Sequence, residues 1–146
     1  MSKITIKELN HNSKHLLFET IKFYDREKNA ANFAASYPRQ IKAFLNYFKD
    51  DEDLLFFTLH QKGIIGFFNI MPHFGEIEIF LLPHLRYKGL GSKCLIAMKK
   101  FLANDSRFDE LDHMQANPTN KEMISALKKA GFWQDIDFDW YKNLRD

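Results

Sequence analysis

The chain has 146 residues, 45% of them hydrophobic, which suits one globular domain spanning residues 1–146. Its 21 Lys and Arg residues nearly balance 19 Asp and Glu residues, and the formal net charge of +2 argues against a nucleic-acid-binding protein, which usually has a clustered basic face. The single cysteine excludes an internal disulfide and gives no metal cluster, so we expect no metal site.

Targeting and membrane signals are not visible in the sequence. Residues 1–6 contain no apolar stretch of the kind that a secretory signal needs. The longest apolar run, at residues 63–71, is far shorter than the roughly 20 residues of a membrane-spanning helix. We therefore expect a cytoplasmic protein that does not bind membranes.

The first half of the chain predicts a strand, two helices and then three strands. Residues 4–9 alternate between apolar and polar side chains, as an edge strand does. Residues 11–29, and a second segment that begins at Pro38, carry apolar side chains at helical spacing. Three predicted strands follow, at residues 54–60, 64–71 and 74–82. The turns between them are short enough for an antiparallel meander.

The second half of the chain alternates helix and strand. A helix is predicted after Gly89, with a buried stripe of Leu90, Cys94, Leu95, Met98, Phe101 and Leu102. Residues 110–115 predict a strand. The next helix opens with a capping box from Thr119 to Glu122 and ends at Gly131. Its predicted buried residues are Met123, Ile124 and Leu127.

The tail after Gly131 is short and allows only a compact final strand pair. Ile136, Phe138 and Trp140 alternate with aspartates and predict the last strand. The sequence therefore predicts an α/β fold with a mixed central sheet, in which an antiparallel meander is followed by β-α-β crossovers and helices cover both faces.

A glycine turn lies between a predicted strand and a predicted helix, with the sequence Arg86-Tyr87-Lys88-Gly89-Leu90-Gly91-Ser92. Free backbone N–H groups and the positive end of the helix dipole converge at such a turn and favour an anion. Arg86 and Lys88 add charge-assisted donors. The turn is not a dinucleotide fingerprint, because Cys94 stands where the third glycine belongs, and Gly-Ser-Lys is the wrong order for a Walker A loop.

The pattern Arg86-x-x-Gly89-x-Gly91, after a strand that ends in Leu-Leu-Pro, resembles the coenzyme A pyrophosphate loop of the GCN5-related N-acetyltransferase (GNAT) family. The segment 117–132 is similar to a second block of that family, with Asn-Pro-Thr-Asn before a helix and Lys-Ala-Gly-Phe at its end. The order of the predicted elements also matches the family along nearly the whole chain. The runs at 88–91 and 130–132 are similar to the bacterial aminoglycoside 6'-type and siderophore acetyltransferases.

This resemblance implies acetyl-coenzyme A as the cofactor. The backbone amides of the glycine turn would hold its pyrophosphate, and the end of the preceding strand would pair with its pantetheine arm. A backbone N–H of that strand would polarise the thioester carbonyl. Asn120 matches a family asparagine that touches the pantetheine side. The cofactor-binding residues so implied are Phe80, Leu81, Leu82, Arg86, Tyr87, Lys88, Gly89, Leu90, Gly91, Ser92 and Asn120.

Glu76 and Glu78 are the candidate catalytic residues. An amine acceptor is mostly protonated near neutral pH and must lose a proton before it attacks. In the strand that contains them, the odd-numbered residues are aliphatic and face the core, so Glu76 and Glu78 share the other face. Family members often keep a carboxylate there, and Glu78 is the first choice because it lies closer to the expected thioester. Two solvated glutamates on an exposed face are the alternative.

One position departs from the family pattern. Many members carry a tyrosine in the last helix that protonates the departing thiolate, and counting from Asn120 places Leu127 there. The spacing supports neither Tyr87 nor Tyr141 as a replacement, and a water molecule would suffice for a thiol leaving group.

The sequence thus predicts an acetyl-coenzyme A-dependent N-acetyltransferase that transfers its acetyl group directly to a primary amine of a small molecule. Three alternatives remain open. They are acetylation of a protein N-terminus or lysine, a coenzyme A-binding module without catalysis, and a nucleotide-binding module. A monomer and a homodimer are both compatible with the sequence.

Overall fold

The computed structural model describes residues 3–9, 55–72, 74–81, 89–116, 121–137 and 139–145. The two predicted helices, at residues 11–29 and in the segment that begins at Pro38, lie outside the described residues. No helix in the described part of the chain is long and apolar enough to cross a membrane.

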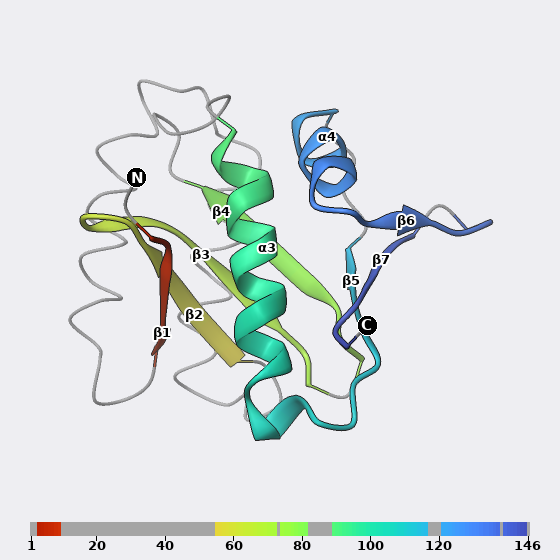
Figure 1. Cartoon of the computed structure of the whole chain (residues 1–146), viewed down its shortest axis with the longest axis horizontal. Coiled ribbons are helices and arrows are strands. Elements are labelled where there is room, and N and C mark those ends of the chain that lie inside the picture. Colours follow the sequence, from red (N-terminus) through yellow and green to blue (C-terminus); the bar gives the residue numbers. More distant parts are fainter. Residues whose placement is uncertain are drawn as a thin grey trace.

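Four strands form the first sheet, and their order follows the chain. They are β1 (Thr5–Leu9), β2 (Leu55–His60), β3 (Ile64–Ile70) and β4 (Ile77–Leu81), paired antiparallel in the order β1-β2-β3-β4 (Figure 1). The predicted meander is confirmed.

The strand predicted from residue 74 begins three residues later. The N–H groups of Phe74 and Gly75 both donate to the carbonyl of Met71, at 3.1 and 2.8 Å, and the N–H of Met71 donates to the carbonyl of Glu76 at 3.1 Å. These bonds close a turn in which Gly75 has a φ of 67°, so extended backbone resumes only at Ile77.

The second half contains α3 (Leu90–Ala103), a short 3-10 helix η3 (Ser106–Phe108), β5 (His113–Ala116), α4 (Lys121–Lys129), β6 (Trp133–Gln134) and β7 (Trp140–Asn143). The last three strands form an antiparallel sheet in the order β5-β7-β6. The predicted strand at 110–115 begins only at His113, because the N–H of Leu111 still donates to the carbonyl of Phe108 in the turn that follows η3.

The last strand differs most from its prediction. The carboxylate of Asp135 accepts hydrogen bonds from the backbone N–H groups of Asp137 and Asp139, at 2.9 and 3.0 Å, and this caps a turn. Ile136 lies in that turn and is 91% exposed. The alternation of apolar residues with aspartates therefore predicted a strand in a segment where Asp135 instead closes the hairpin between β6 and β7.

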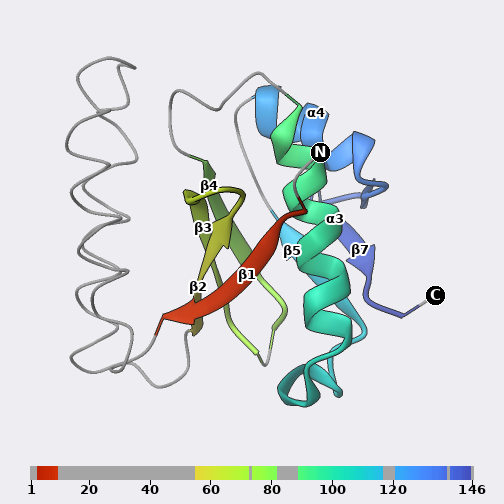
Figure 2. The same ribbon diagram turned by 60° about the vertical axis from the view of Figure 1, so that its left-hand side comes forward.

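The main core lies between α3 and the first sheet. Cys94, Leu95, Met98 and Leu102 of α3 are fully buried, as the helical stripe predicted. Phe101 of the same helix packs edge-on against Phe57 of β2 with ring centroids 5.3 Å apart. In Figures 1 and 2, α3 lies along one face of the sheet, with α4 beside its N-terminal end. The mixed α/β fold is confirmed.

Candidate active site

The two sheets meet where β4 and β5 begin. Glu76 and Gln115 form a parallel bridge, in which the N–H of Gln115 donates to the carbonyl of Gly75 at 2.7 Å. Glycine is needed at position 75 because a Cβ there would lie 2.4 Å from the carbonyl oxygen of His113. Beyond this bridge, the described parts of β4 and β5 pair only with β3 and β7, and Figure 1 shows the two strands diverging toward their carboxyl ends.

Glu76 and Gln115 lie on the sheet face opposite α3 and α4. Ile77, Met114 and Ala116 belong to the core under those helices, and side chains alternate along a strand. Glu76 is exposed. The packing of its neighbours agrees with the predicted face for Glu76, whose catalytic role stays a prediction.

Asn69 is a residue of this region that the sequence analysis missed. It lies directly opposite Glu78 in the register of β3 and β4. Asn69 is only 6% exposed and, with Thr58, is one of two buried polar side chains in the described part of the chain. Buried amides need hydrogen-bond partners, so an asparagine inside an aromatic strand, Phe67-Phe68-Asn69, was the available signal.

The described start of α3 has features that favour an anion. Gly89 is the N-cap residue with a φ of 76°, no side chain caps the helix, and its first turn contains no acidic residue. A Cβ on Gly91 would lie 3.0 Å from the Cβ of Ala126, so this glycine lets α4 approach the helix start closely. The first amides of a 14-residue helix carry its partial positive charge.

Replacing Gly89 with alanine is expected to lower the free energy of unfolding by about 1 kcal/mol, because alanine disfavours positive φ. No atom of the described residues lies within 4 Å of a Cβ at this position, so we attribute the loss to backbone conformation. Asparagine tolerates this conformation, and Gly89→Asn should lose less. Urea unfolding of the three proteins measures the difference, and equal stability of Gly89→Ala and wild type would contradict it.

Six of the residues predicted to bind the cofactor lie at the C-terminal end of β4 or at the start of α3. The backbone of Phe80 and Leu81 pairs with β3, while Gly89, Leu90, Gly91 and Ser92 form the start of α3. Leu82, Arg86, Tyr87, Lys88 and Asn120 lie outside the described residues, as does Thr119 of the predicted capping box.

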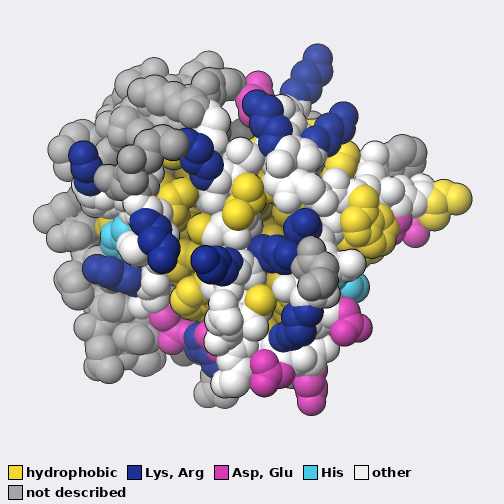
Figure 3. Space-filling model, viewed as in Figure 1, with side chains coloured by type: hydrophobic (Ala, Val, Ile, Leu, Met, Phe, Trp, Pro, Cys, Tyr) yellow, Lys and Arg dark blue, Asp and Glu magenta, His cyan; other side chains and the backbone are white. Residues whose placement is uncertain are grey.

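Lysine and arginine side chains spread over the face of the molecule that carries α3, whereas aspartate and glutamate side chains gather along its lower edge (Figure 3). Exposed lysines of the two helices include Lys93, Lys100, Lys128 and Lys129. This distribution of charge favours an anionic ligand near the helices.

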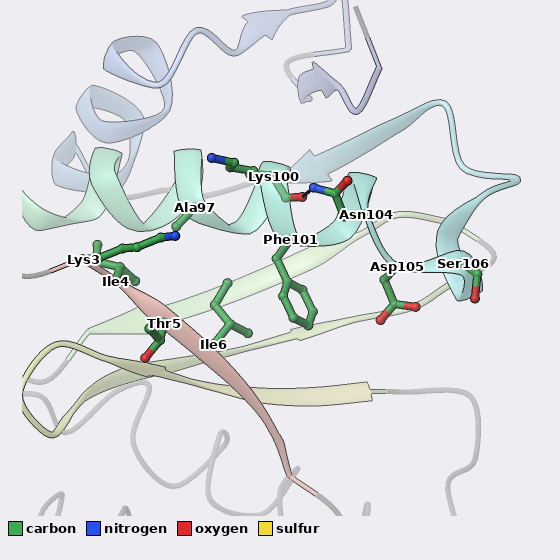
Figure 4. A pocket seen from close by; sticks show the side chains of 10 residues that line it. All are labelled: Lys3, Ile4, Thr5, Ile6, Ala97, Lys100, Phe101, Asn104, Asp105 and Ser106. Atoms are coloured by element: carbon green, nitrogen blue, oxygen red, sulfur yellow. Dashed lines mark hydrogen bonds between the residues drawn. The ribbon is translucent and has the colours of Figure 1, made fainter.

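A separate groove runs between β1 and the C-terminal half of α3. Ile4, Ile6 and Phe101 line it with apolar surface. Figure 4 shows Lys3 at one end of the groove and Asp105 and Ser106 at the other, with Lys100 on α3 between them. None of the predicted site residues lines this groove, so a ligand bound there would not contact the start of α3.

Leu127 is fully buried in the core. Leucine has no hydroxyl group, so this position of α4 offers no acid to a ligand. The helix ends as predicted at Gly131, which has a φ of 88°, and the N–H of Phe132 donates to the carbonyl of Leu127 at 2.9 Å.

Within the described part of the chain, no three His, Cys, Asp or Glu side chains are placed to hold a metal ion.

Cys94 is buried, and burial raises the pKa of its thiol to about 12. The native thiol should therefore stay protonated and resist a disulfide-exchange reagent at pH 8, while unfolded protein reacts at once. Above the unfolded pKa of about 9, the unfolded chain releases this proton and the native chain keeps it, so the thiol lowers stability as pH rises. Rapid native labelling would contradict the assignment of Cys94 as a core residue.

Three features of the described structure matter here. The first sheet is an antiparallel meander, α3 begins at a glycine, and β4 and β5 diverge beyond the bridge between Glu76 and Gln115. The family model of the Acetyltransferase (GNAT) family matches residues 14–132. The chain therefore belongs to the GNAT family of acetyltransferases and is an acyltransferase.

Several solved structures share this fold at low sequence identity. The aminoglycoside acetyltransferase AAC(6')-Ib in complex with coenzyme A is 18% identical, with a TM-score of 0.67 over 97% of this chain and 95% of that one. A structure described as a phosphinothricin N-acetyltransferase is 16% identical, with a TM-score of 0.65 over 99% and 100%. The Campylobacter jejuni N-acetyltransferase PseH in complex with acetyl-coenzyme A is 20% identical, with a TM-score of 0.53 over 94% and 95%. A search of curated protein sequences gave no match.

Proposed function

We propose that this protein transfers an acetyl group from acetyl-coenzyme A directly to a primary amine of a small molecule. The observation that carries the proposal is the position of Glu76 beside Gln115, where β4 and β5 begin to diverge. We expect the thioester between β4 and β5, so a carboxylate at this point would lie close to it. A small-molecule acceptor also agrees with structural neighbours crystallised with aminoglycosides.

The residues at the start of α3 are assigned to the cofactor. Backbone amides of Gly89, Leu90, Gly91 and Ser92 would bind the pyrophosphate, because the helix start is positive and uncapped. Arg86, Tyr87, Lys88 and Asn120 retain the roles that their motifs predict. When bound, acetyl-coenzyme A supplies the acetyl group and a thiolate leaving group.

The chain's own contribution to the chemistry begins with the amine proton. Glu78 is assigned as the general base, directly or through a water molecule, with Glu76 as the second candidate. Asn69, opposite Glu78 in the backbone register, is assigned a positioning role through its buried amide. Backbone N–H groups near Leu81 would stabilise negative charge on the thioester oxygen. Leu127 offers no acid, so water protonates the thiolate.

A thiol-release assay with acetyl-coenzyme A tests this proposal. The panel of acceptors comprises amino acids, amino sugars, polyamines, aminoglycosides and peptides. Turnover of a small amine, and none of peptides, is the expected result. Turnover of peptides alone would favour acetylation of proteins, whereas cofactor binding without any thiol release would favour a non-catalytic module.

A further inference from the structure

A row of side chains crosses the second sheet from the proposed active site to its outer edge. Glu76 pairs with Gln115, Gln115 pairs with Tyr141, and Tyr141 pairs with Trp133. Residues that are paired across neighbouring strands point to the same face, so these four side chains share the face opposite α4. The packing of Trp140 agrees, since it is buried and lies under the ammonium group of Lys128 of α4, at 6.0 Å.

The outer half of the row is an aromatic surface. The ring of Trp133 stacks on Tyr141 with centroids 4.9 Å apart, and His113 packs edge-on against the same tyrosine at 4.8 Å. Trp133 nevertheless remains 52% exposed. Figure 1 shows the β6–β7 hairpin projecting from the rest of the described molecule. Burial in the core therefore does not explain this tryptophan.

The same hairpin places negative charge beside the rings. Its turn carries Asp135, Asp137 and Asp139 within seven residues of Trp133. The pKa of the Tyr141 hydroxyl is raised, first by desolvation and then by a hydrogen bond to Asp135 and the charges of all three aspartates. An exposed aromatic face in a negative field attracts cations more strongly than either feature alone.

We propose that the surface formed by Trp133, Tyr141 and the aspartate turn binds a second positive charge of the acceptor, so that the preferred substrates are diamines or polyamines. This inference rests on the proposed function. One ammonium group loses its proton near Glu76 and Glu78 while another lies against Trp133. Three strand spacings of about 4.8 Å separate Glu76 from Trp133, which suits amines roughly 14 Å apart or somewhat less.

Turnover of a linear diamine series against matched monoamines tests the proposal. We expect kcat/KM to rise with chain length for diamines and not for monoamines. Trp133→Ala should raise the KM for long diamines about tenfold and leave their kcat and all monoamine kinetics unchanged. Trp133→Phe, which keeps a ring face, should restore most of the lost affinity.

Ile96→Ala provides the matched control. Ile96 is 53% exposed, about as much as Trp133, but it lies on α3 on the other side of the sheet. This variant should behave as wild type with every amine. An equal loss in Ile96→Ala and Trp133→Ala would overturn the inference, as would equal efficiency of diamines and monoamines in the wild type.

A binding measurement separates this inference from the proposed function. Bis-quaternary diammonium compounds cannot be acetylated, because their nitrogens carry no proton. The chain has two tryptophans, and Trp140 is only 6% exposed, so such compounds should quench mainly the emission of Trp133. Quenching without turnover of any amine would refute the function and support the site. Turnover without quenching, and without an effect of Trp133→Ala, would refute the site alone.

Discussion

Replacing Glu78 with glutamine is expected to lower kcat by about 10²-fold or more and leave the affinity for acetyl-coenzyme A unchanged. Glutamine keeps the size of the side chain and removes its capacity to accept a proton. General-base catalysis contributes about 10²- to 10⁴-fold in enzymes, so the loss should appear in kcat. Glu76→Gln should have a smaller effect, because the thioester is expected farther along β4.

Steady-state kinetics with the best amine of the panel, together with calorimetric titration of coenzyme A, measures both quantities. Glu110→Gln is the matched control, since Glu110 is exposed and precedes β5 outside the proposed site. A wild-type rate in both Glu78→Gln and Glu76→Gln would show that neither carboxylate is the base. A loss of cofactor affinity equal to the loss of rate would assign Glu78 to binding instead.

Replacing Gly75 with alanine is expected to lower the free energy of unfolding by about 3 kcal/mol and to abolish most activity. The new methyl group would lie 2.4 Å from the carbonyl oxygen of His113, which belongs to the backbone and cannot move aside cheaply. The backbone at position 75 also has a φ of 67°, which alanine disfavours. We therefore expect β4 and β5 to move apart, which weakens the 2.7 Å hydrogen bond from the N–H of Gln115 to the carbonyl of Gly75.

Gly63→Ala separates the two causes. Gly63 also has a positive φ, 124°, but no atom in the described part of the chain lies within 4 Å of a Cβ at that position. Urea unfolding and turnover of both variants should show backbone strain alone in Gly63→Ala and a further loss of stability and rate in Gly75→Ala. Full activity of folded Gly75→Ala would contradict the claim that the bridge between β4 and β5 sets the geometry of the site.

Much of the fold was predictable from local pattern. The buried stripe of α3 follows helical spacing, and the meander follows from short turns between apolar strands. Errors arose where a side chain redirects the backbone, as at Asp135, whose hydrogen bonds turn a segment of alternating residues into a hairpin. A strand of two residues such as β6 has too little pattern to be recognised.

The candidate site was predictable only in part. Glu76 and Gly89 could be proposed as site residues because strand alternation and the glycine motif are both visible within a few neighbouring residues. The relation of Gln115 to Tyr141 and Trp133 depends on the register between β5, β7 and β6, which no single segment encodes. The same holds for Asn69, whose importance comes from its partner Glu78 on β4. The site roles of all the predicted residues, Arg86, Lys88 and Asn120 included, stay predictions.

Titration of isotopically labelled protein with coenzyme A, followed through its backbone amide resonances, tests the central claim most directly. The account predicts the largest shift changes at Gly89, Leu90, Gly91 and Ser92, with further changes at Phe80 and Leu81, and weaker binding of NAD and ATP. Changes confined to Lys3, Ile6 and Phe101 in the groove between β1 and α3, with none at the start of α3, would contradict it.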